Sequence, residues 1–384
     1  MPGPMIRSTC SRKAMTELLL EAGRDDAAWR RAISGVDGAD VYDDPVYARS
    51  TAERIEGGEA WLAAYSGEEG DAFSVVALRR IGDLPFARNL EAGSGPGLCD
   101  VATPYGYGGP RLAPAAGKSG KLGERFGSLM RRFCTEHRVV TEFVRFHPSC
   151  DPSASGLYDT DTRGRVWFLN LGGSADDLLS GFSAPCRRAI RKAETAGLTV
   201  REVDVVAGMA RFVDLYHETM RRLGASGFYL FGANYFTDLI GLGERLLLID
   251  VSKSGKTAAM GLFLVGPDTV HYHLGASSRE LMEYRPNNLL FFHAALAAKR
   301  RGRNRLHLGG GMGGLRLDDA VSDRDGLDRF KSGFGTMAAP FYVGRRIWNE
   351  EDYSICMNEY EAYSKSAAGL AGGYFPPYRD PAVD

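Results

Sequence analysis

Residues 246–310 read LLLIDVSKSGKTAAMGLFLVGPDTVHYHLGASSRELMEYRPNNLLFFHAALAAKRRGRNRLHLGG, and this stretch indicates the fold. Its apolar and β-branched residues predict three strands, at Leu246–Val251, Ala258–Val265 and Thr269–Leu274. Short turns containing Gly or Pro join these strands, which is typical of antiparallel neighbours. A helix from about Pro286 to Arg301 and a strand at Arg305–Leu308 follow.

The elements on either side extend this pattern. Before it, the sequence predicts a strand at Val166–Leu171, helices near 174–180 and 183–196, and a further helix with an apolar face from Met209 to Leu223. After it, we expect a short helix near Leu327–Ser332 and a final strand region at Ala338–Trp348. The order is strand, helices, three antiparallel strands, helix, strand, helix, strands.

The first part of the chain shows a shorter version of this order. Strands are predicted at Ala60–Tyr65 and Phe73–Ile81, before the Gly/Pro-rich loop Thr103–Pro110. An amphipathic helix at Leu122–Phe133 and the strand Val139–His147 follow. We therefore predict an α/β protein with a mixed sheet, in which the same architecture occurs twice in tandem. The expected divisions are an N-terminal extension (1–38), a first domain (39–150), a second domain (151–350) and a C-terminal helix with a surface tail (351–384).

Composition limits the possible classes of protein. The formal net charge is -1, so contact with nucleic acid must come from local basic patches. Six scattered cysteines indicate reduced thiols rather than a disulfide framework. Neither a signal peptide nor a run of about 20 apolar residues is evident, so we expect a cytoplasmic protein without a transmembrane segment.

Four short segments resemble the Fem-type aminoacyltransferases, a branch of the GNAT acyltransferase superfamily. They are TPYGYGGP (103–110), RRAIRKAE (187–194), YRPNNLL (284–290) and GLDRFKSGFG (326–335). Within roughly residues 40–348 their order is similar to that of the family, whose members join two GNAT-like domains in one chain. The resemblance implies transfer of an aminoacyl group from aminoacyl-tRNA to an amine, which forms an amide bond.

The chain departs from these relatives in two respects. The GNAT pyrophosphate loop, Gln/Arg-x-x-Gly-x-Gly/Ala, is absent before the helix at Pro286, which disfavours acetyl-CoA as the donor. The long helical-hairpin arm of some Fem proteins is also missing. The alternative function is an acyl-CoA-dependent GNAT N-acyltransferase acting on a small amine, and a non-catalytic binding protein is a third hypothesis.

Lys331, between Phe330 and Phe334, is the leading catalytic candidate. The resemblance aligns it with the lysine that stabilises the oxyanion in Fem-type enzymes. A fixed ammonium offsets the negative charge that develops on a carbonyl oxygen under attack. The alternative is a surface lysine whose aliphatic stem packs between the two phenylalanines.

The helix start near Pro286 is a candidate donor-binding site, and Phe330 and Phe334 are further candidates for donor binding. Free N–H groups and the helix dipole favour an anion there, with Asn287 and Asn288 in the first turn and Arg279 and Arg285 upstream. The alternative is an ordinary helix start, since Pro and Asn are common at such positions.

Basic residues predict contact with the tRNA backbone. The candidates are Arg187, Arg191, Arg300 and Arg303. Residues 279–305 hold seven Lys or Arg and two Asp or Glu, a local excess of five positive charges. The alternative is a solvated basic face.

The acceptor is expected in the cleft between the two domains. Tyr105 and Tyr107 supply rings and hydroxyls on a loop that glycines allow to approach a ligand. Arg145 is a further acceptor candidate, and Asp328 belongs to an acidic stretch that begins at Asp318 and suits an ammonium group. The alternative for the tyrosines is a packed connection between the domains.

His271 and His273 alternate on one predicted strand and therefore share a face. No third ligand has metal-site spacing, so we predict no metal site. His273 is a candidate catalytic base, and the alternative is a core histidine with a satisfied hydrogen bond.

The resemblance to the Fem-type enzymes, together with these patterns, implies an aminoacyl-tRNA-dependent aminoacyltransferase. Its acceptor is an amine on a peptidoglycan precursor or on a small specialised metabolite. No cofactor is expected beyond the aminoacyl-tRNA or acyl-CoA co-substrate. The protein is expected to be a monomer or a homodimer.

Overall fold

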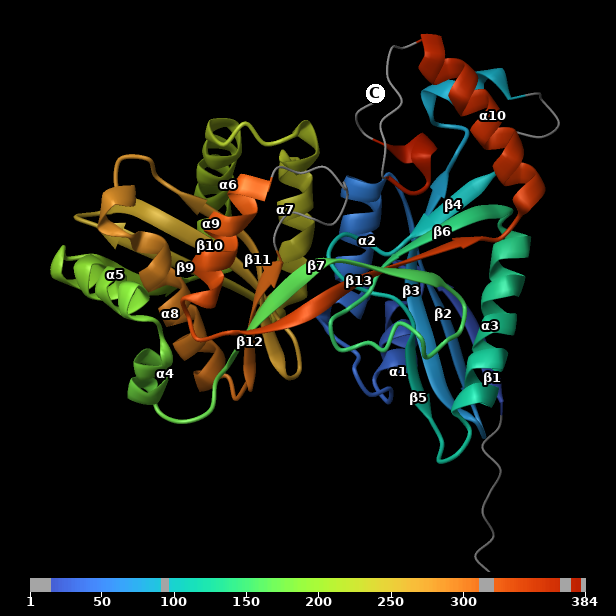
Figure 1. The fold of residues 1–384 in the computed structure, drawn as a ribbon. Helices are drawn as coiled ribbons and strands as arrows, with labels where there is room; N and C mark the ends of the chain where they lie inside the picture. The colour runs from blue at the N-terminus through green and yellow to red at the C-terminus, as the bar shows by residue number, and fades with distance from the viewer. Residues whose placement is uncertain (1–14, 91–96, 311–320, 367–373, 381–384) are drawn as a thin grey trace, which may run out of the picture.

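A single mixed sheet connects both halves of the molecule (Figure 1). The computed structural model describes residues 15–90, 97–310, 321–366 and 374–380. Within these residues thirteen strands form one sheet in the order β1-β2-β3-β4-β6-β13-β7-β12-β11-β10-β9-β8, and β5 pairs with β3. Segments far apart in the sequence are therefore neighbours at the centre of the sheet.

The first half surrounds the helix that the sequence predicted most clearly. Its strands are β1 (Thr16–Glu21), β2 (Gly58–Gly67), β3 (Gly70–Arg80), β4 (Cys99–Ala102), β5 (Arg111–Pro114) and β6 (Val139–Arg145). Its α-helices are α1 (Asp26–Ile33), α2 (Pro45–Thr51) and α3 (Ser119–Glu136). The apolar stripe of α3, from Leu122 to Phe133, is buried against β2 and β3 as expected.

The second half repeats this order with additional helices. Its strands are β8 (Thr199–Val203), β9 (Leu246–Lys253), β10 (Lys256–Val265), β11 (Thr269–Ser277) and β12 (Arg305–Gly310). Its helices are α4 (Ala175–Gly181), α5 (Ala184–Thr195), α6 (Val205–Arg222), α7 (Ala233–Leu239), α8 (Pro286–Arg300) and α9 (Val321–Ser332). In each half three antiparallel strands lead through one long helix to a strand parallel to the third, β4 with β6 and β11 with β12. This repetition confirms the predicted tandem architecture.

Two long strands cross from one half to the other. In Figure 1, β7 (Asp159–Asn170) and β13 (Met337–Ile347) run side by side through the centre of the molecule. The end of β7 pairs with β12 of the second half, whereas the end of β13 pairs with β6 of the first. Helix α10 (Glu350–Ser366) then packs against β6. The chain therefore enters the second half through β7 and returns to the first half through β13.

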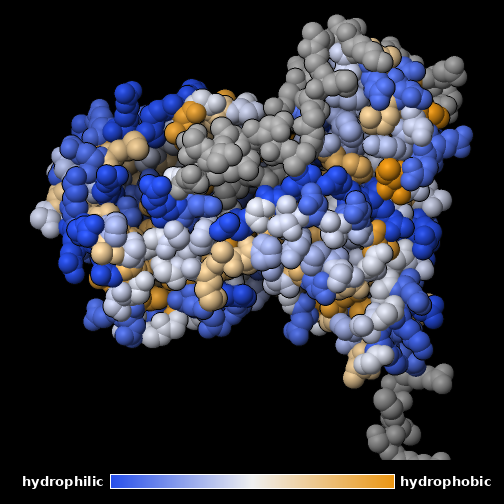
Figure 2. All heavy atoms as spheres, in the orientation of Figure 1, coloured by the Kyte–Doolittle hydropathy of each residue, from blue (hydrophilic) through white to orange (hydrophobic). Residues whose placement is uncertain are grey.

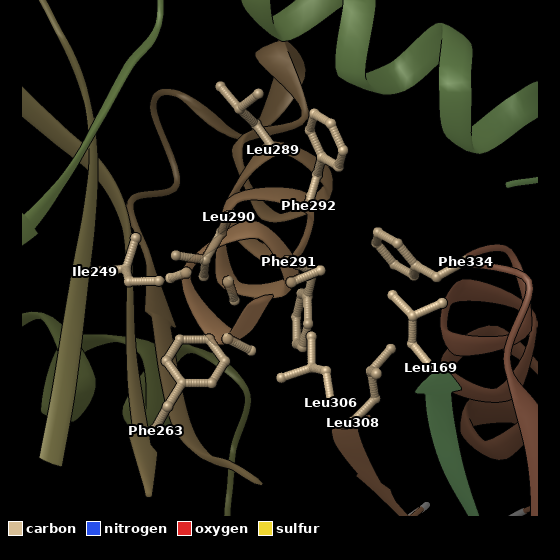
Figure 3. Close-up of a cluster of buried hydrophobic side chains, with 14 of the residues drawn as sticks. Leu169, Ile249, Phe263, Leu289, Leu290, Phe291, Phe292, Leu306, Leu308 and Phe334 are labelled. Atoms are coloured by element: carbon tan, nitrogen blue, oxygen red, sulfur yellow. The ribbon is translucent and has the colours of Figure 1, made fainter. Parts of the chain in front are cut away.

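The second half has a core on each face of its sheet. On one face, α8 packs its buried residues against β9 and β10, together with Phe334 and the strand residues Leu306 and Leu308 (Figure 3). Helix α8 has apolar residues all around because α5 covers its outer side. On the other face, aromatic residues of α6 and α7 pack with Tyr42 and Tyr47 of the first half. This shared core fixes the two halves to each other.

Some segments differ from the sequence-based expectation. Part of the predicted N-terminal extension forms β1, which pairs with β2 at the edge of the sheet. The tail after about residue 365 was expected on the surface, and that is wrong for Tyr378, which is 4% exposed. Its hydroxyl lies 3.1 Å from the Thr141 hydroxyl of β6, and Arg379 pairs with buried Asp100, so polar contacts accompany this packing.

Candidate active site

The candidate site lies where the parallel strands β11 and β12 separate. Their pairing ends at His271 opposite His307. Beyond this pair β11 stays paired with β10, whereas β12 continues to Gly310 without pairing with β11. Strands that separate in this way expose backbone groups that no longer pair with each other. We refer to this place as the strand fork.

Lys331 reaches the end of β12 from helix α9. Its Nζ donates a hydrogen bond of 2.5 Å to the carbonyl oxygen of Gly310. The residue is 3% exposed, so it is not the surface lysine of the alternative interpretation. Burial lowers the pKa of Lys331 to about 8, and the charge of Asp328 offsets part of this effect. The ammonium is therefore held in a poorly solvated position, where its charge acts strongly.

The two phenylalanines around Lys331 anchor this turn of α9. Phe334 is fully buried and packs against Phe182 and Phe291, and Phe330 also contacts Phe291 (Figure 3). The aromatic contacts attach the Phe-Lys-x-x-Phe segment to α8. These contacts fix the position of Lys331 relative to the strand fork. They assign Phe330 and Phe334 a packing role, and donor binding by them stays a prediction.

A buried cluster of polar side chains occupies the other side of the strand fork. Asp40 accepts a hydrogen bond of 3.1 Å from Nε2 of His271, and the Nδ1 atoms of His271 and His307 lie 3.2 Å apart. His147 places its Nε2 3.3 Å from the same Asp40 oxygen. Asp40 and His147 come from the first half, so both halves build this cluster. The sequence-based prediction did not identify Asp40, His147 or His307.

The cluster holds the carboxylate of Asp40 beside the neutral imidazoles of His147 and His307. Burial favours the neutral acid, yet the pKa of Asp40 lies well below its usual value because His271 and His147 stabilise the carboxylate. Burial lowers the pKa of His147 to about 3 and that of His307 well below its usual value. At neutral pH, Asp40 is therefore charged while His147 and His307 are not.

The same side chains have the donor types of a metal site. A carboxylate oxygen of Asp40 and one ring nitrogen each of His147 and His271 lie within 4.8 Å of one another. Both ring nitrogens of His271, however, already take part in hydrogen bonds, to Asp40 and to His307. We therefore describe the group as a hydrogen-bonded relay, and the expected absence of a metal stays a prediction for a metal assay.

His273 points to a different environment from Lys331. Its Nε2 lies 2.6 Å from the hydroxyl of Tyr235, among Tyr47 and Tyr105, and burial lowers its pKa to about 3. This contact agrees with the interpretation of a histidine satisfied by a hydrogen bond. A catalytic role for His273 stays a prediction.

The predicted acceptor residues are divided between two places. Half-buried Tyr107 packs edge-on against His307 at the strand fork, with ring centroids 5.1 Å apart. Tyr105 packs against Phe231 and His273 instead. Asp328 accepts a hydrogen bond of 3.0 Å from Nε1 of Trp167, near Lys331.

Arg145 lies in a buried ion network of the first half. It pairs with Glu56, which also pairs with Arg79, and Arg79 pairs with Asp100. Arg145 also donates to the carbonyl oxygen of Thr103. These contacts lie where β4 ends beside β6. Arg145 therefore has its partners within the protein, and direct acceptor contact stays a prediction.

The start of α8 keeps the features expected of a donor-binding site. Arg285 precedes the helix with a left-handed backbone (φ 61°), and no side chain caps the first turn. Asn288 is half-buried and lies near the thiol of Cys186 on α5, at 3.6 Å. Asn287 is also half-buried, whereas Arg279 and Arg285 are exposed. The four predicted donor residues therefore gather at one end of α8.

A basic pocket lies beside this end of α8. It has a volume of about 540 Å³ and is lined by Arg188, Arg191, Lys192, Thr195, Ala196 and Tyr284. Figure 2 shows hydrophilic side chains gathered on this side of the molecule. Of the predicted tRNA contacts, only Arg191 lines the pocket.

The other three predicted tRNA contacts have partners within the protein. Arg187 donates to the carbonyl oxygens of Ser180 and Phe182, and Arg303 donates to that of Pro267. Arg300 pairs with Glu202 at the far end of α8, about 22 Å from Arg285 at 1.5 Å per residue.

Comparisons with known proteins agree with this architecture. Residues 180–331 match the family model of the acetyltransferase (GNAT) domain. The structure is similar to that of FemX, with a TM-score of 0.66, 14% identity, and coverage of 86% of this chain and 98% of FemX. A conserved protein of unknown function from Bacteroides thetaiotaomicron VPI-5482 has a TM-score of 0.54 at 8% identity, over 84% of this chain and 96% of that one. The comparison with curated protein sequences gave no significant match.

The domain match and the fold define the class of this protein, which is an acyltransferase of GNAT fold. Within that class, its two joined halves have the arrangement found in FemX. No described helix is both long and apolar enough to cross a membrane.

Proposed function

We propose that the chain is an aminoacyl-tRNA-dependent aminoacyltransferase that forms an amide bond on an amine acceptor. The observation that carries the proposal is the buried ammonium of Lys331, held at the strand fork by the Phe-Lys-x-x-Phe segment. In this mechanism the acceptor nitrogen attacks the ester carbonyl of the donor. Lys331 then stabilises the oxyanion without transferring a proton.

The position of the basic groups supports a polyanionic donor. Arg188, Arg191 and Lys192 line one pocket, and Arg279 and Arg285 lie at the neighbouring start of α8. A tRNA acceptor end offers successive phosphates to such a surface. The acceptor amine would enter past Tyr107, from the junction of the two halves.

The second candidate is an acyl-CoA-dependent N-acyltransferase. The match of residues 180–331 to the acetyltransferase (GNAT) domain favours it. The start of α8 would then receive the CoA pyrophosphate, because helix N-termini bind such anions. The missing glycine-containing pyrophosphate loop counts against this candidate.

A donor-consumption assay separates the two functions. The wild-type protein is incubated with an amine panel and either a charged tRNA pool or a panel of acyl-CoA thioesters. We expect deacylation of tRNA that depends on the amine and forms an amide. Amine-dependent release of free CoA instead would overturn the tRNA assignment, and consumption of neither donor would overturn both.

A further inference from the structure

The relay of Asp40, His271 and His307 ends on an unused nitrogen. Asp40 lies 3.1 Å from Nε2 of His271, and Nδ1 of His271 lies 3.2 Å from Nδ1 of His307. Among the described residues, Nε2 of His307 is buried and has no hydrogen-bond partner. Several described side chains have such an atom, and Nε2 of His307 differs from them because it lies at the end of this relay.

The chemistry of the relay determines where its protons lie. The carboxylate of Asp40 only accepts, so Nε2 of His271 carries the proton of that hydrogen bond. One of the two Nδ1 atoms donates to the other, and a base at His307 requires the donor to be Nδ1 of His307. Neutral His307 therefore has an unprotonated Nε2.

The backbone around Asp40 is shaped for this contact. Asp40 begins a 3-10 turn, and its second carboxylate oxygen accepts a hydrogen bond of 2.5 Å from the backbone of Val41. Gly266, in the turn before β11, approaches so closely that a Cβ there would lie 2.2 Å from this second oxygen. Glycine at this position thus allows Asp40 of the first half to reach His271 of the second.

The unused nitrogen and Lys331 both lie at the strand fork, on opposite sides of it. His307 is the last residue of β12 that pairs with β11, and Lys331 binds the Gly310 carbonyl three residues further along β12. The rings of Phe168, His271 and Tyr107 surround His307, and of these only Tyr107 is half-exposed. Because Tyr107 is the least buried of these rings, we expect an acceptor to approach His307 from the side of Tyr107.

We infer that His307 is the base that accepts the proton of the acceptor amine, and that Asp40 and His271 are its positioning residues. This inference rests on the proposed acyl transfer, whichever donor is used. As the N–C bond forms and the bond from the carbonyl carbon to the leaving atom breaks, the amine proton passes to Nε2 of His307. The same proton then passes to the departing oxygen or sulfur, which returns His307 to its neutral form.

The first test compares His307→Gln with a control histidine variant. Loss of a general base lowers the rate about 10²- to 10⁴-fold. We expect this loss in kcat for His307→Gln, while His137→Gln, at the end of α3 and outside the site, keeps the wild-type rate. Wild-type transfer together with an unchanged rate in His307→Gln overturns the base assignment. If the wild type transfers nothing, the proposed function fails instead.

The second test reports on the relay without activity. In ¹⁵N NMR spectra of the full chain with labelled histidine, His307 should show a protonated Nδ1 and an unprotonated Nε2. An Asp40→Asn amide that donates to His271 reverses both hydrogen bonds, which places the His307 proton on Nε2. In Asp40→Asn we expect the spectra to show a protonated Nε2 and an unprotonated Nδ1 for His307. We also expect kcat to fall, as it does for a catalytic triad with the wrong histidine tautomer. A protonated Nε2 in the wild type would overturn the relay.

A third variant disturbs the position of Asp40, and its new methyl group would also lie 3.0 Å from the carbonyl oxygen of Thr269. In Gly266→Ala the new methyl group pushes on the Asp40 carboxylate and removes no hydrogen-bonding group. We expect kcat to fall more than the acceptor KM changes, and the pH profile of kcat to shift. Gly82→Ala, in the turn after β3, is the control, because neither Gly266 nor Gly82 has a positive φ and a Cβ at Gly82 would meet nothing within 4 Å. Equal kcat values and pH profiles in the two variants would show that Asp40 does not act through position.

Discussion

Lys331 combines a charged group with a site that removes most of its water. Below a pH of about 8 it is an ammonium, and above that value it increasingly becomes a neutral amine. Only the ammonium offsets a full oxyanion charge. The pH dependence of kcat therefore reports whether Lys331 acts as an ammonium.

We expect Lys331→Met to lower kcat about 100-fold, the scale for losing one oxyanion donor. In the wild type kcat should decrease with an apparent pKa near 8, provided that chemistry limits the rate. Lys331→Arg, if it retains activity, should move that decrease to higher pH because a guanidinium stays charged. Kinetics from pH 6 to 10 test both points, with exposed Lys121→Met of α3 as control. Equal rates in folded Lys331→Met and wild type would reject the assignment.

Tyr107 is the predicted acceptor residue that the structure places at the strand fork. We expect Tyr107→Ala to raise the acceptor KM several-fold and to leave the donor KM nearly unchanged, because its half-exposed ring covers His307. Steady-state kinetics with each substrate varied in turn measure the two constants. Tyr105→Ala should have a smaller effect, since its ring packs against Phe231. A larger change in the donor KM would move the acceptor elsewhere.

At this scale the sequence predicted only part of the site. Lys331 was predicted from the resemblance of its segment to the Phe-Lys-x-x-Phe element, whose residues are neighbours in sequence, and its catalytic role stays a prediction. Asp40, by contrast, is 231 residues from His271, and His307 is 36 residues away. Only the parallel register of β11 and β12 brings His307 opposite His271. A possible sequence signal was the alternation of Leu306, His307 and Leu308, which places a histidine on the face opposite two core residues.

At the scale of elements, helices with a clear apolar stripe were predicted well. Helix α3 was expected at 122–133 and extends over Ser119–Glu136, and α8 lies within one residue of its predicted bounds. The strands β1, β4 and β5 were missed because they have only four to six residues. Neighbouring strands stabilise such short segments more than their own sequence does.

The pocket beside α5 and α8 makes a prediction about the donor. We expect Arg188→Gln combined with Arg191→Gln to weaken tRNA binding and to flatten its dependence on salt. Each lost phosphate contact lowers the log–log slope by roughly 0.7–0.9, because fewer counterions are released. Binding measured from 50 to 300 mM salt tests this. Arg131→Gln combined with Lys121→Gln, two exposed changes on α3, supplies a control of equal charge.

Two outcomes would count against tRNA at this surface. One is a wild-type slope near zero, and the other is an equal slope in the pocket variant and the α3 control. Retained binding of a small acyl-CoA by the wild type would then favour the second donor. Arg300 and Arg303 are expected to contribute less to tRNA binding than the pocket residues. Arg300 already pairs with Glu202, and Arg303 already donates to the carbonyl oxygen of Pro267.

At the scale of the whole molecule, buried histidines link stability to pH. Burial lowers the pKa of His147 and His273 to about 3 and lowers that of His307, against 6.5 for an ordinary histidine. As the pH falls below about 6.5, the unfolded chain binds three protons that the folded chain does not, so stability falls. Glu142 acts in the opposite direction between about 4.5 and 7, because burial raises its pKa to about 7.

The difference near pH 5.5 is therefore about two protons. Since one proton corresponds to about 1.4 kcal/mol per pH unit, the free energy of unfolding should decrease by roughly 2–3 kcal/mol per unit of acidification. Urea unfolding at pH 5, 6 and 7 measures this slope. His147→Gln should reduce the slope by about one proton, whereas replacing exposed residues of α3 should not. A slope near zero would show that these histidines become protonated in the folded state.

The strands β7 and β13 also constrain how such a molecule can be recombined. A chimera made by one crossover near residue 150 would receive β7 and β13 from one parent but β6 from the other. Such a chimera would have to form foreign pairs in the middle of its sheet as well as at its junction. A second crossover before Val343 would give β6 and the part of β13 that pairs with it the same parent. In such a chimera, each strand should therefore come from the same parent as the strands with which it pairs, even where these are distant in the sequence.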